Sequence, residues 1–242
     1  MDIRALLQKH APLWGGNLGL IRGVEHRIRL KPGIVPVRQH TCMAGPLARE
    51  RDKAEVERMR SMWVIEPSTG EWASPVDIVP KPDGSVRFCI YYRKLNMMTV
   101  KDAYPIPKMD EYIDSLGDAR VFSTLDCNSV YWQTPVADGD KHLTAFTCHS
   151  GAWQCVRLPF GLCNAPATFE RAMDMILAGV KWQTCFVYLD DVIVFSSSPE
   201  EHLQHLDEVL TPGVVTDIYQ RNISRHYIHS NPEYGSRRHI RI

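Results

Sequence analysis

Residues 184–196 read TCFVYLDDVIVFS, and two apolar, strand-like runs flank the adjacent pair Asp190-Asp191. β-branched and aromatic residues dominate both runs, and each run is about as long as a short strand. The pattern predicts a β-hairpin with the two aspartates at its turn, because Asp side chains hydrogen-bond the backbone of turns. Carboxylates beside buried strands are costly to bury unless a cation neutralises them. A divalent metal such as Mg²⁺ suits this position; an exposed turn is the simpler alternative.

The composition is that of an ordinary globular protein, with 44% apolar and 23% charged residues among 242. This length suffices for one large or two small domains. We find no signal peptide and no apolar run near the ~20 residues of a membrane span, so we expect no membrane association. The 7 cysteines form no CxxC pair, which favours reduced thiols in a cytoplasmic or nuclear protein over a zinc site.

Charge is distributed unevenly along the chain, although the formal net charge is +0. Residues 212–242 contain more arginines than acidic residues, which leaves the remainder slightly acidic. The part that we expect to fold therefore lacks an overall basic footprint. Any affinity of that part for nucleic acid has to come from local basic patches.

A second hairpin with a possible anion site is predicted at residues 74–90. Two strand-like runs flank Pro-Asp-Gly, which fits a three-residue loop built on a type I turn. This loop pairs Val79 with Arg87 and Lys81 with Ser85, so Lys81 and Arg87 share one face. Two cations on one face suit a triphosphate, although two exposed basic residues on a surface hairpin would look the same.

The other patterns predict a mainly helical set of elements around these strands. We interpret His202 and His205, on the last helix, as part of a solvated face rather than as ligands. In the charged helix predicted at 46–63, Met62 and Trp63 are available for packing. The elements are a charged helix at 46–63, a helix at 109–116, a strand at 121–126 ending in Asp126, a hairpin around Ser150-Gly151, a helix at 166–180 and a capped helix at 198–210.

Five sequence segments occur in a fixed order along the chain: WASPVDIVPKPDGSVRFCIYYRKLN, TVKDAYPIP, FSTLDCNSVYWQTPV, LPFGLCNAPATFERAMD and YLDDVIVFS. Together, in this order and spacing, they resemble the reverse transcriptase of gypsy-type LTR retrotransposons. The resemblance implies an α+β, right-hand polymerase fold with fingers and palm, in which helices back an antiparallel palm sheet and the thumb is missing. It covers residues 27–210, with an N-terminal linker or extension at 1–26 and a divergent, poorly ordered tail at 211–242. A shifted reading frame or misjoined exon is our hypothesis for that tail.

The resemblance also implies a role for individual positions. It implies RNA-directed DNA polymerase activity with two Mg²⁺ ions, or Mn²⁺ in their place, acting on an RNA or DNA template with primer and deoxynucleoside triphosphates. The catalytic and metal-holding residues are Asp126, Asp190 and Asp191; the nucleotide-binding residues are Lys81, Arg87, Tyr131, Phe160 and Gly161; Tyr188 contacts the primer.

Three positions depart from the family pattern. Tyr91 stands where Asp is usual, Val130 where Gly is usual, and Glu170 where Gln is common. One alternative is therefore a catalytically inactive remnant that at most binds nucleic acid weakly. A metal-dependent nuclease using the same three aspartates is a further alternative, which the predicted nucleotide-binding residues disfavour.

Overall fold

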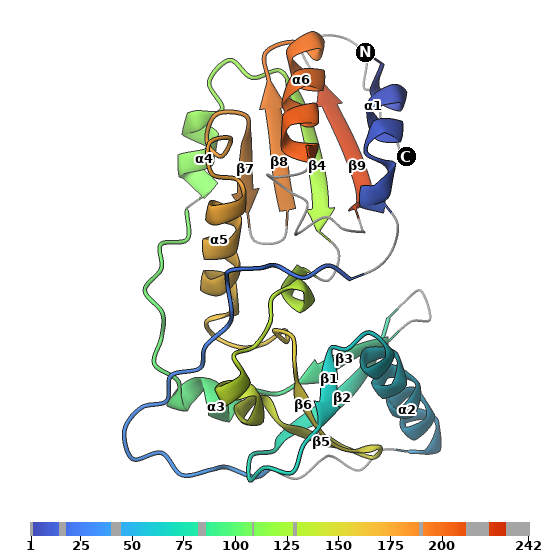
Figure 1. The fold of residues 1–242 in the computed structure, drawn as a ribbon, viewed down its shortest axis with the longest axis vertical. Coiled ribbons are helices and arrows are strands. Elements are labelled where there is room, and N and C mark those ends of the chain that lie inside the picture. Colours follow the sequence, from blue (N-terminus) through green and yellow to red (C-terminus); the bar gives the residue numbers. More distant parts are fainter. Residues whose placement is uncertain are drawn as a thin grey trace. The chain divides into compact units, whose positions relative to one another are not determined.

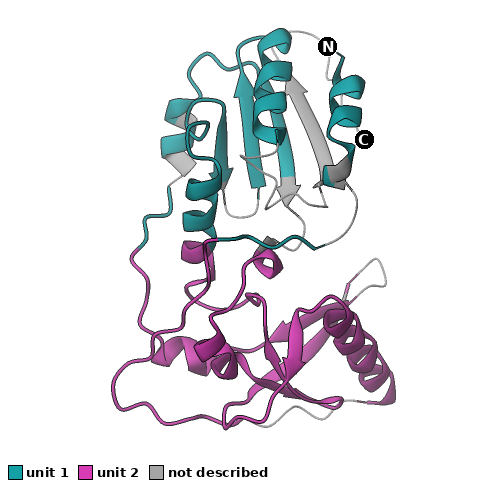
Figure 2. Ribbon diagram, in the orientation of Figure 1, with its two compact units in different colours: residues 1–22, 104–130, 169–242 teal, residues 23–103, 131–168 magenta. Residues whose placement is uncertain are grey.

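The computed structural model describes the chain except residues 1, 15–17, 40–44, 82–85, 108, 128–129, 189–190, 212–222 and 231–242. The chain divides into two compact units (Figure 2). Unit 1 combines residues 1–22, 104–130 and 169–242, and unit 2 combines residues 23–103 and 131–168. The chain therefore passes between the units several times. None of the helices in the described part combines the length and apolar character that crossing a bilayer requires.

Unit 1 contains a four-stranded antiparallel sheet with helices around it (Figure 1). The strand order is β7-β8-β4-β9. The strands are β4 (Val121–Cys127), β7 (Cys185–Tyr188), β8 (Asp191–Ser196) and β9 (Ile223–Ser230). The helices are α1 (Ile3–Lys9), η1 (Ala11–Trp14), α4 (Met109–Ser115), α6 (Pro199–Leu210) and most of α5 (Ala165–Ile176).

Side-chain alternation gives this sheet two different faces. Phe195 stacks on Phe186 with ring centroids 4.4 Å apart, and Tyr112 of α4 lies 4.9 Å from Phe186. Val192 and Val194, which alternate with Phe195 along β8 and so belong to the opposite face, are fully buried. Both faces of β8 are thus packed along the strand, which explains the nearly continuous apolar run in the sequence.

The interpretation of His202 as a solvated residue was wrong. Only 3% of His202 is exposed, and its ring nitrogens lie 2.7 Å from Ser123 Oγ and 3.0 Å from Ser196 Oγ. His202 shares its helical stripe with buried Leu206, so α6 turns it toward the sheet. His205 is partly buried and lies 2.8 Å from the same Ser196 hydroxyl. The serine hydroxyls replace the water that a histidine ring would otherwise contact.

Unit 2 is built on a five-stranded sheet with the order β1-β6-β5-β2-β3. The β2–β5 pair is parallel and the other described pairs are antiparallel. The strands are β1 (Ile65–Pro67), β2 (Ser74–Pro80), β3 (Val86–Ile90), β5 (Phe146–Cys148) and β6 (Gly151–Cys155). The helices are α2 (Pro46–Ser61), α3 (Arg93–Met98), most of η2 (Val130–Gln133) and η3 (Asp138–Thr144).

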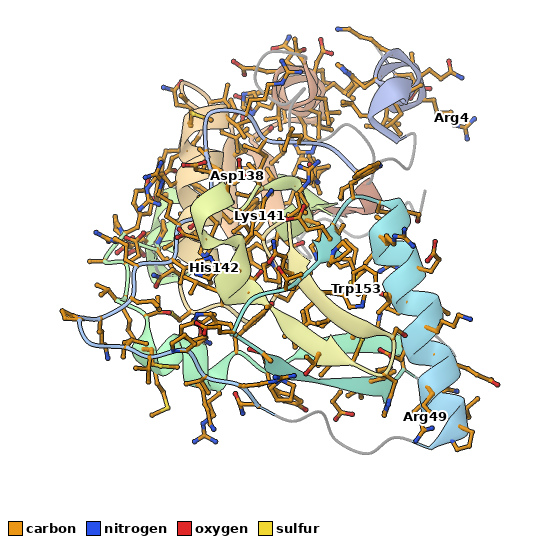
Figure 3. The ribbon with its side chains drawn as sticks, turned by 60° about the horizontal axis from the view of Figure 1, so that its bottom comes forward. Arg4, Arg49, Asp138, Lys141, His142 and Trp153 are labelled. Atoms are coloured by element: carbon orange, nitrogen blue, oxygen red, sulfur yellow. The ribbon has the colours of Figure 1, made fainter. Side chains whose placement is uncertain are left out.

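The core of unit 2 surrounds the buried ring of Tyr92, which packs with Leu95 and Leu158. The Tyr92 hydroxyl donates a hydrogen bond to the carbonyl of Thr144, 2.9 Å away, so this polar group is satisfied inside the core. At the surface, Lys141 of η3 pairs with Asp138 at 2.7 Å (Figure 3).

Most predicted elements of unit 2 are present, but one packing prediction was wrong. The hairpin around Ser150-Gly151 is confirmed, with Phe146 opposite Trp153. Helix α2 ends at Ser61, so Trp63 does not continue its apolar stripe. Instead, Trp63 adopts a left-handed backbone conformation with φ 56 and is 77% exposed.

Of residues 212–242, which belong to the tail that we expected to be poorly ordered, the structure describes only the backbone of β9, which pairs with β4. The other residues of 212–242 lie outside the described part of the chain. The predicted boundaries at residues 26 and 210 stay predictions.

Candidate active site

The described register brings two of the predicted catalytic positions together at one end of the unit 1 sheet. Asp126, on β4, pairs directly with Asp191, on β8, and Asp191 pairs on its other side with Tyr188 of β7. Residues directly opposite in an antiparallel pair belong to the same face of the sheet. Asp190 and the hairpin turn lie outside the described residues, as do the side chains of Asp126 and Tyr188.

The backbone around this sheet end is firmly packed. Leu125 precedes Asp126 on β4, and Val192 follows Asp191 on β8. These two apolar residues pair with each other and are buried. The Tyr112 hydroxyl donates a hydrogen bond to the carbonyl of Val187 on β7. The two aspartate positions therefore belong to a rigid scaffold, as a preorganised site requires.

A divalent metal fits the donor chemistry of this sheet end. Asp126 and Asp191 occupy opposite positions, and carboxylate oxygens are the ligands that Mg²⁺ prefers. Among the described side chains, no group of three His, Cys, Asp or Glu is arranged to hold a metal ion. Asp190 and the Asp126 carboxylate, which would complete the predicted set of three, are outside that description.

A buried ion-pair cluster, which sequence analysis missed, joins α5 to the segment before β7. Lys181 Nζ lies 2.6 Å from Glu170 Oε1 and also pairs with Asp174. Tyr104 donates a hydrogen bond to Asp174, and the Arg171 guanidinium lies 4.5 Å from the Tyr104 ring centroid. The only sequence signal is the i, i+4 spacing of the two acids, which is common on solvated helices.

The electrostatics of this cluster follow from burial. Burial raises the pKa of Glu170, and the hydrogen bond from Lys181 opposes that rise. Burial works to lower the pKa of Lys181, but its hydrogen bonds to Asp174 and Glu170 outweigh burial, so that pKa is raised. Lys181 thus stays charged and compensates the buried carboxylate that stands where Gln is common in the family.

The two predicted phosphate-binding cations lie on the β2–β3 hairpin of unit 2. Val79 pairs with Arg87 and Pro80 with Val86, which is the register predicted from the sequence. Lys81 and Arg87 are exposed. The predicted turn falls on residues 82–85, outside the described part of the chain.

The other predicted nucleotide-binding residues also belong to unit 2 and touch one another. The rings of Tyr131 and Phe160 meet edge to face, with centroids 4.9 Å apart, and Phe160 is 50% exposed. Gly161 follows with φ +95, and a Cβ at this position would lie 3.4 Å from the carbonyl oxygen of Ile90. Both its conformation and its surroundings therefore favour glycine.

Asn96, which sequence analysis did not single out, fixes the loop that carries these residues. Its side-chain amide donates to the carbonyl of Gly161 at 2.8 Å and accepts from the backbone N–H of Cys163 at 2.9 Å. These two bonds hold the loop against α3. Their partners are more than sixty residues away in sequence, so local patterns did not predict them.

The model of the family described as reverse transcriptase (RNA-dependent DNA polymerase) matches residues 79–214, which is more than half of the chain. The chain belongs to the reverse transcriptase family. The match includes all nine predicted site residues of this reverse transcriptase-family chain, from Lys81 to Asp191.

Curated relatives confirm the predicted type of element. The chain is 41% identical over 174 residues to the retrovirus-related Pol polyprotein from transposon 297 of Drosophila melanogaster, covering 69% of the chain and 16% of the relative. It is 38% identical over 162 residues to the Pol polyprotein from transposon gypsy of the same organism, covering 64% of the chain and 16% of that relative. The chain thus spans about 16% of the length of these relatives.

Solved structures confirm the predicted polymerase fold. A mutant of the prototype foamy virus protease–reverse transcriptase matches with a TM-score of 0.76 and 26% identity over 86% of this chain and 28% of that one. The foamy viral enzyme in complex with an RNA/DNA hybrid matches with a TM-score of 0.78 over 89% of this chain and 29% of that one. At 23% identity, the second likeness concerns the fold alone.

Proposed function

We propose that this reverse transcriptase-family chain catalyses RNA-directed DNA synthesis, transferring a nucleotide to a primer 3′-hydroxyl. The observation that carries the proposal is the pairing of Asp126 with Asp191 at one end of a packed antiparallel sheet. Phosphoryl transfer depends mainly on positioning and on electrostatic stabilisation, which a rigid carboxylate site with bound cations supplies.

The carboxylates of Asp126, Asp190 and Asp191 would hold the divalent cations, two Mg²⁺ ions or Mn²⁺ in their place. Bound in this way, the cations would stabilise the charge that develops on the transferred phosphate. The protein's own contribution is to hold Asp126 and Asp191 in register on neighbouring strands. Neighbouring carboxylates repel one another, so the site is expected to be stable in this form only when cations are bound.

The incoming nucleotide and the primer would contact separate groups of residues. Lys81 and Arg87 bind the triphosphate, Arg87 through its forked guanidinium. The Tyr131 ring lies beneath the deoxyribose and excludes a 2′-hydroxyl, with Phe160 and Gly161 lining the same pocket. Tyr188 contacts the primer end.

Nucleic-acid partners are an RNA or DNA template with its primer. Base pairing selects each nucleotide, so we expect phosphate contacts rather than reading of base edges by the protein. Structures of the foamy viral relative in complex with an RNA/DNA hybrid and with double-stranded DNA support this choice. A location in the cytoplasm or nucleus stays a prediction.

Primer extension tests the proposal. A labelled DNA primer on an RNA template is incubated with the 242-residue chain, deoxynucleoside triphosphates and Mg²⁺, and in parallel with Mn²⁺. We expect extension by the unaltered chain and a loss on the order of 10²-fold or more in Asp191→Asn, as for removal of one preorganised electrostatic group. Equal extension by both proteins would refute the assignment of Asp191.

The same assay addresses the non-catalytic alternative. The departure from the family pattern at Val130 favours that alternative, because a β-branched residue is bulkier and stiffer than the usual glycine. Absence of extension with both metals, by a chain that is folded and binds primer–template, would support an inactive nucleic-acid-binding remnant. Val130→Gly should then restore extension if the bulk is the cause.

A further inference from the structure

Helix α3 of unit 2 forms one wall of an open groove with a volume of about 990 Å³. The segments before and after α3 and the loop containing Gly161 complete its lining. Its cationic, aromatic and apolar side chains include Lys31, Tyr91, Arg93, Met97, Val100 and Lys101.

The charge of this groove is one-sided. Lys31, Arg93 and Lys101 are exposed cations, and none of the described residues lining the groove is acidic. The formal net charge of the chain is +0, so the positive charge of the groove is a local feature. The Lys31 ammonium donates a hydrogen bond to the carbonyl of Met97 at 2.8 Å, which anchors one cation to the wall. The groove therefore suits an extended anion.

Aromatic and apolar surface accompanies these cations. Tyr91 is 49% exposed, while its backbone N–H donates to the carbonyl of Pro75 at 2.9 Å. The Tyr91 hydroxyl donates to Asp77 Oδ2 at 3.3 Å, which restricts the orientation of the ring. Met97 and Val100 are 68% and 37% exposed. A phosphate group alone would gain nothing from such surface, whereas a nucleobase would.

The lining of the groove is preorganised rather than assembled on binding. Asn96 clamps the loop at Gly161 and Cys163 through two hydrogen bonds, and Gly161 approaches the carbonyl of Ile90 too closely for an easy replacement. A rigid lining lowers the entropy lost when a ligand binds.

We propose that Tyr91 is a stacking platform for an unpaired base of a nucleic-acid strand whose phosphates contact Lys31, Arg93 and Lys101. Cations that follow a backbone beside an aromatic ring that accepts a base are the general means of binding single strands. The proposal rests on the proposed function, since the unpaired template of a polymerase would supply this strand. It assigns Tyr91 a role that an aspartate at the same position would not provide.

The test is single-strand binding by the 242-residue chain, without metal, primer or nucleoside triphosphate. Fluorescence anisotropy of a labelled oligouridylate and a labelled oligothymidylate gives the dissociation constants. Tyr91→Ala should weaken binding of both by about 5- to 150-fold, the range for loss of one stacked base. Tyr91→Phe, which keeps the ring, should stay within about threefold of the unaltered chain.

Three controls separate stacking from charge and from the mere exposure of an aromatic ring. Trp63→Ala removes another exposed aromatic residue of unit 2 that does not line the groove, and binding should not change. Arg93→Ala should reduce the slope of log affinity against log salt by about 0.7, the value for one phosphate contact on a single strand. An abasic oligomer of equal charge should bind the unaltered chain and Tyr91→Ala equally.

Equal affinities of Tyr91→Ala and the unaltered chain for the oligomers, with folding verified by circular dichroism, would overturn the proposal. A discrimination against the abasic oligomer that survives in Tyr91→Ala would also overturn it, because another residue would then stack the base. Preferred binding of duplex over single strand, unaffected by the variants, would count against it too. Failure of primer extension with these affinities intact would refute only the polymerase function.

Discussion

Replacing Lys181 by Met is expected to destabilise unit 1 strongly and in a pH-dependent manner. The substitution keeps an unbranched side chain of similar volume but removes the charge that pairs with Glu170 at 2.6 Å. Glu170 has a side-chain exposure of only 3%, so water cannot replace the lysine. Asp174 is 35% exposed and remains partly solvated. The penalty therefore falls on Glu170.

The magnitude follows from proton linkage. A carboxylate left buried without a partner avoids the cost of burial by taking up a proton, since burial already raises the pKa of Glu170. Protonating a carboxyl whose ordinary pKa is 4.5 costs about 3.4 kcal/mol at pH 7 and about 0.7 kcal/mol at pH 5. We expect a loss of about 3 kcal/mol at pH 7, in the range for breaking a buried pair, and a much smaller loss at pH 5.

The direction in which the stability loss changes with pH distinguishes an unpaired buried carboxylate from a simple packing defect. A raised pKa in the folded state gives stability at low pH that is lost as the pH rises, so Lys181→Met should be least stable relative to the unaltered chain at neutral pH. Urea unfolding followed by circular dichroism at pH 7 and pH 5 measures both losses. Adding Glu170→Gln to Lys181→Met should recover most of the stability at pH 7. A loss below about 1 kcal/mol at pH 7, or one equal at both pH values, would refute the reasoning.

Three further predictions concern stability at single positions. Burial lowers the pKa of His26 to about 4, and the charge of Asp102 opposes this effect, so the stability that neutral His26 contributes is complete above pH 6.5 and is lost as the pH falls toward 4. The unfolding free energy of His26→Gln should therefore depend less on pH over this range. A pH dependence equal to that of the unaltered chain would contradict this prediction. Gly161→Ala should cost about 1–2 kcal/mol in thermal unfolding because of its φ of +95, whereas Gly139→Ala, with open space around the position, serves as a matched control. Ser198→Ala should cost about 1 kcal/mol, because the Ser198 side chain accepts a hydrogen bond from the backbone of Glu201 at 3.2 Å, and Ser198→Asp should retain most of this stability.

Sequence predicted the elements whose signals are local. The Pro-Asp-Gly loop and the alternation around it gave the register in which Val79 lies opposite Arg87. The capped helix predicted at 198–210 begins as expected, since the side chain of Ser198 accepts a hydrogen bond from the backbone N–H of Glu201 at the start of α6. In each case the residues that set the geometry lie within a few positions of one another.

Features that depend on distant partners were not predictable in the same way. His202 lies among acidic and polar neighbours in sequence, but Ser123, which contacts its ring, is separated from it by 79 positions. Lys181 follows the helix that carries Glu170, and no local pattern distinguishes it from a solvated lysine. The opposite placement of Asp126 and Asp191 likewise came from the family resemblance and not from any local signal.

The alternation of the chain between the two units affects how this protein emerges from a ribosome. Strand β4 is synthesised before residues 131–168 of unit 2, whereas its neighbour β8 follows them. The nascent β4 therefore has an unpaired edge while much of the other unit is being made. Chaperone binding to that edge, or a pause in translation before β8, would alter the yield of native protein without changing any residue of the site.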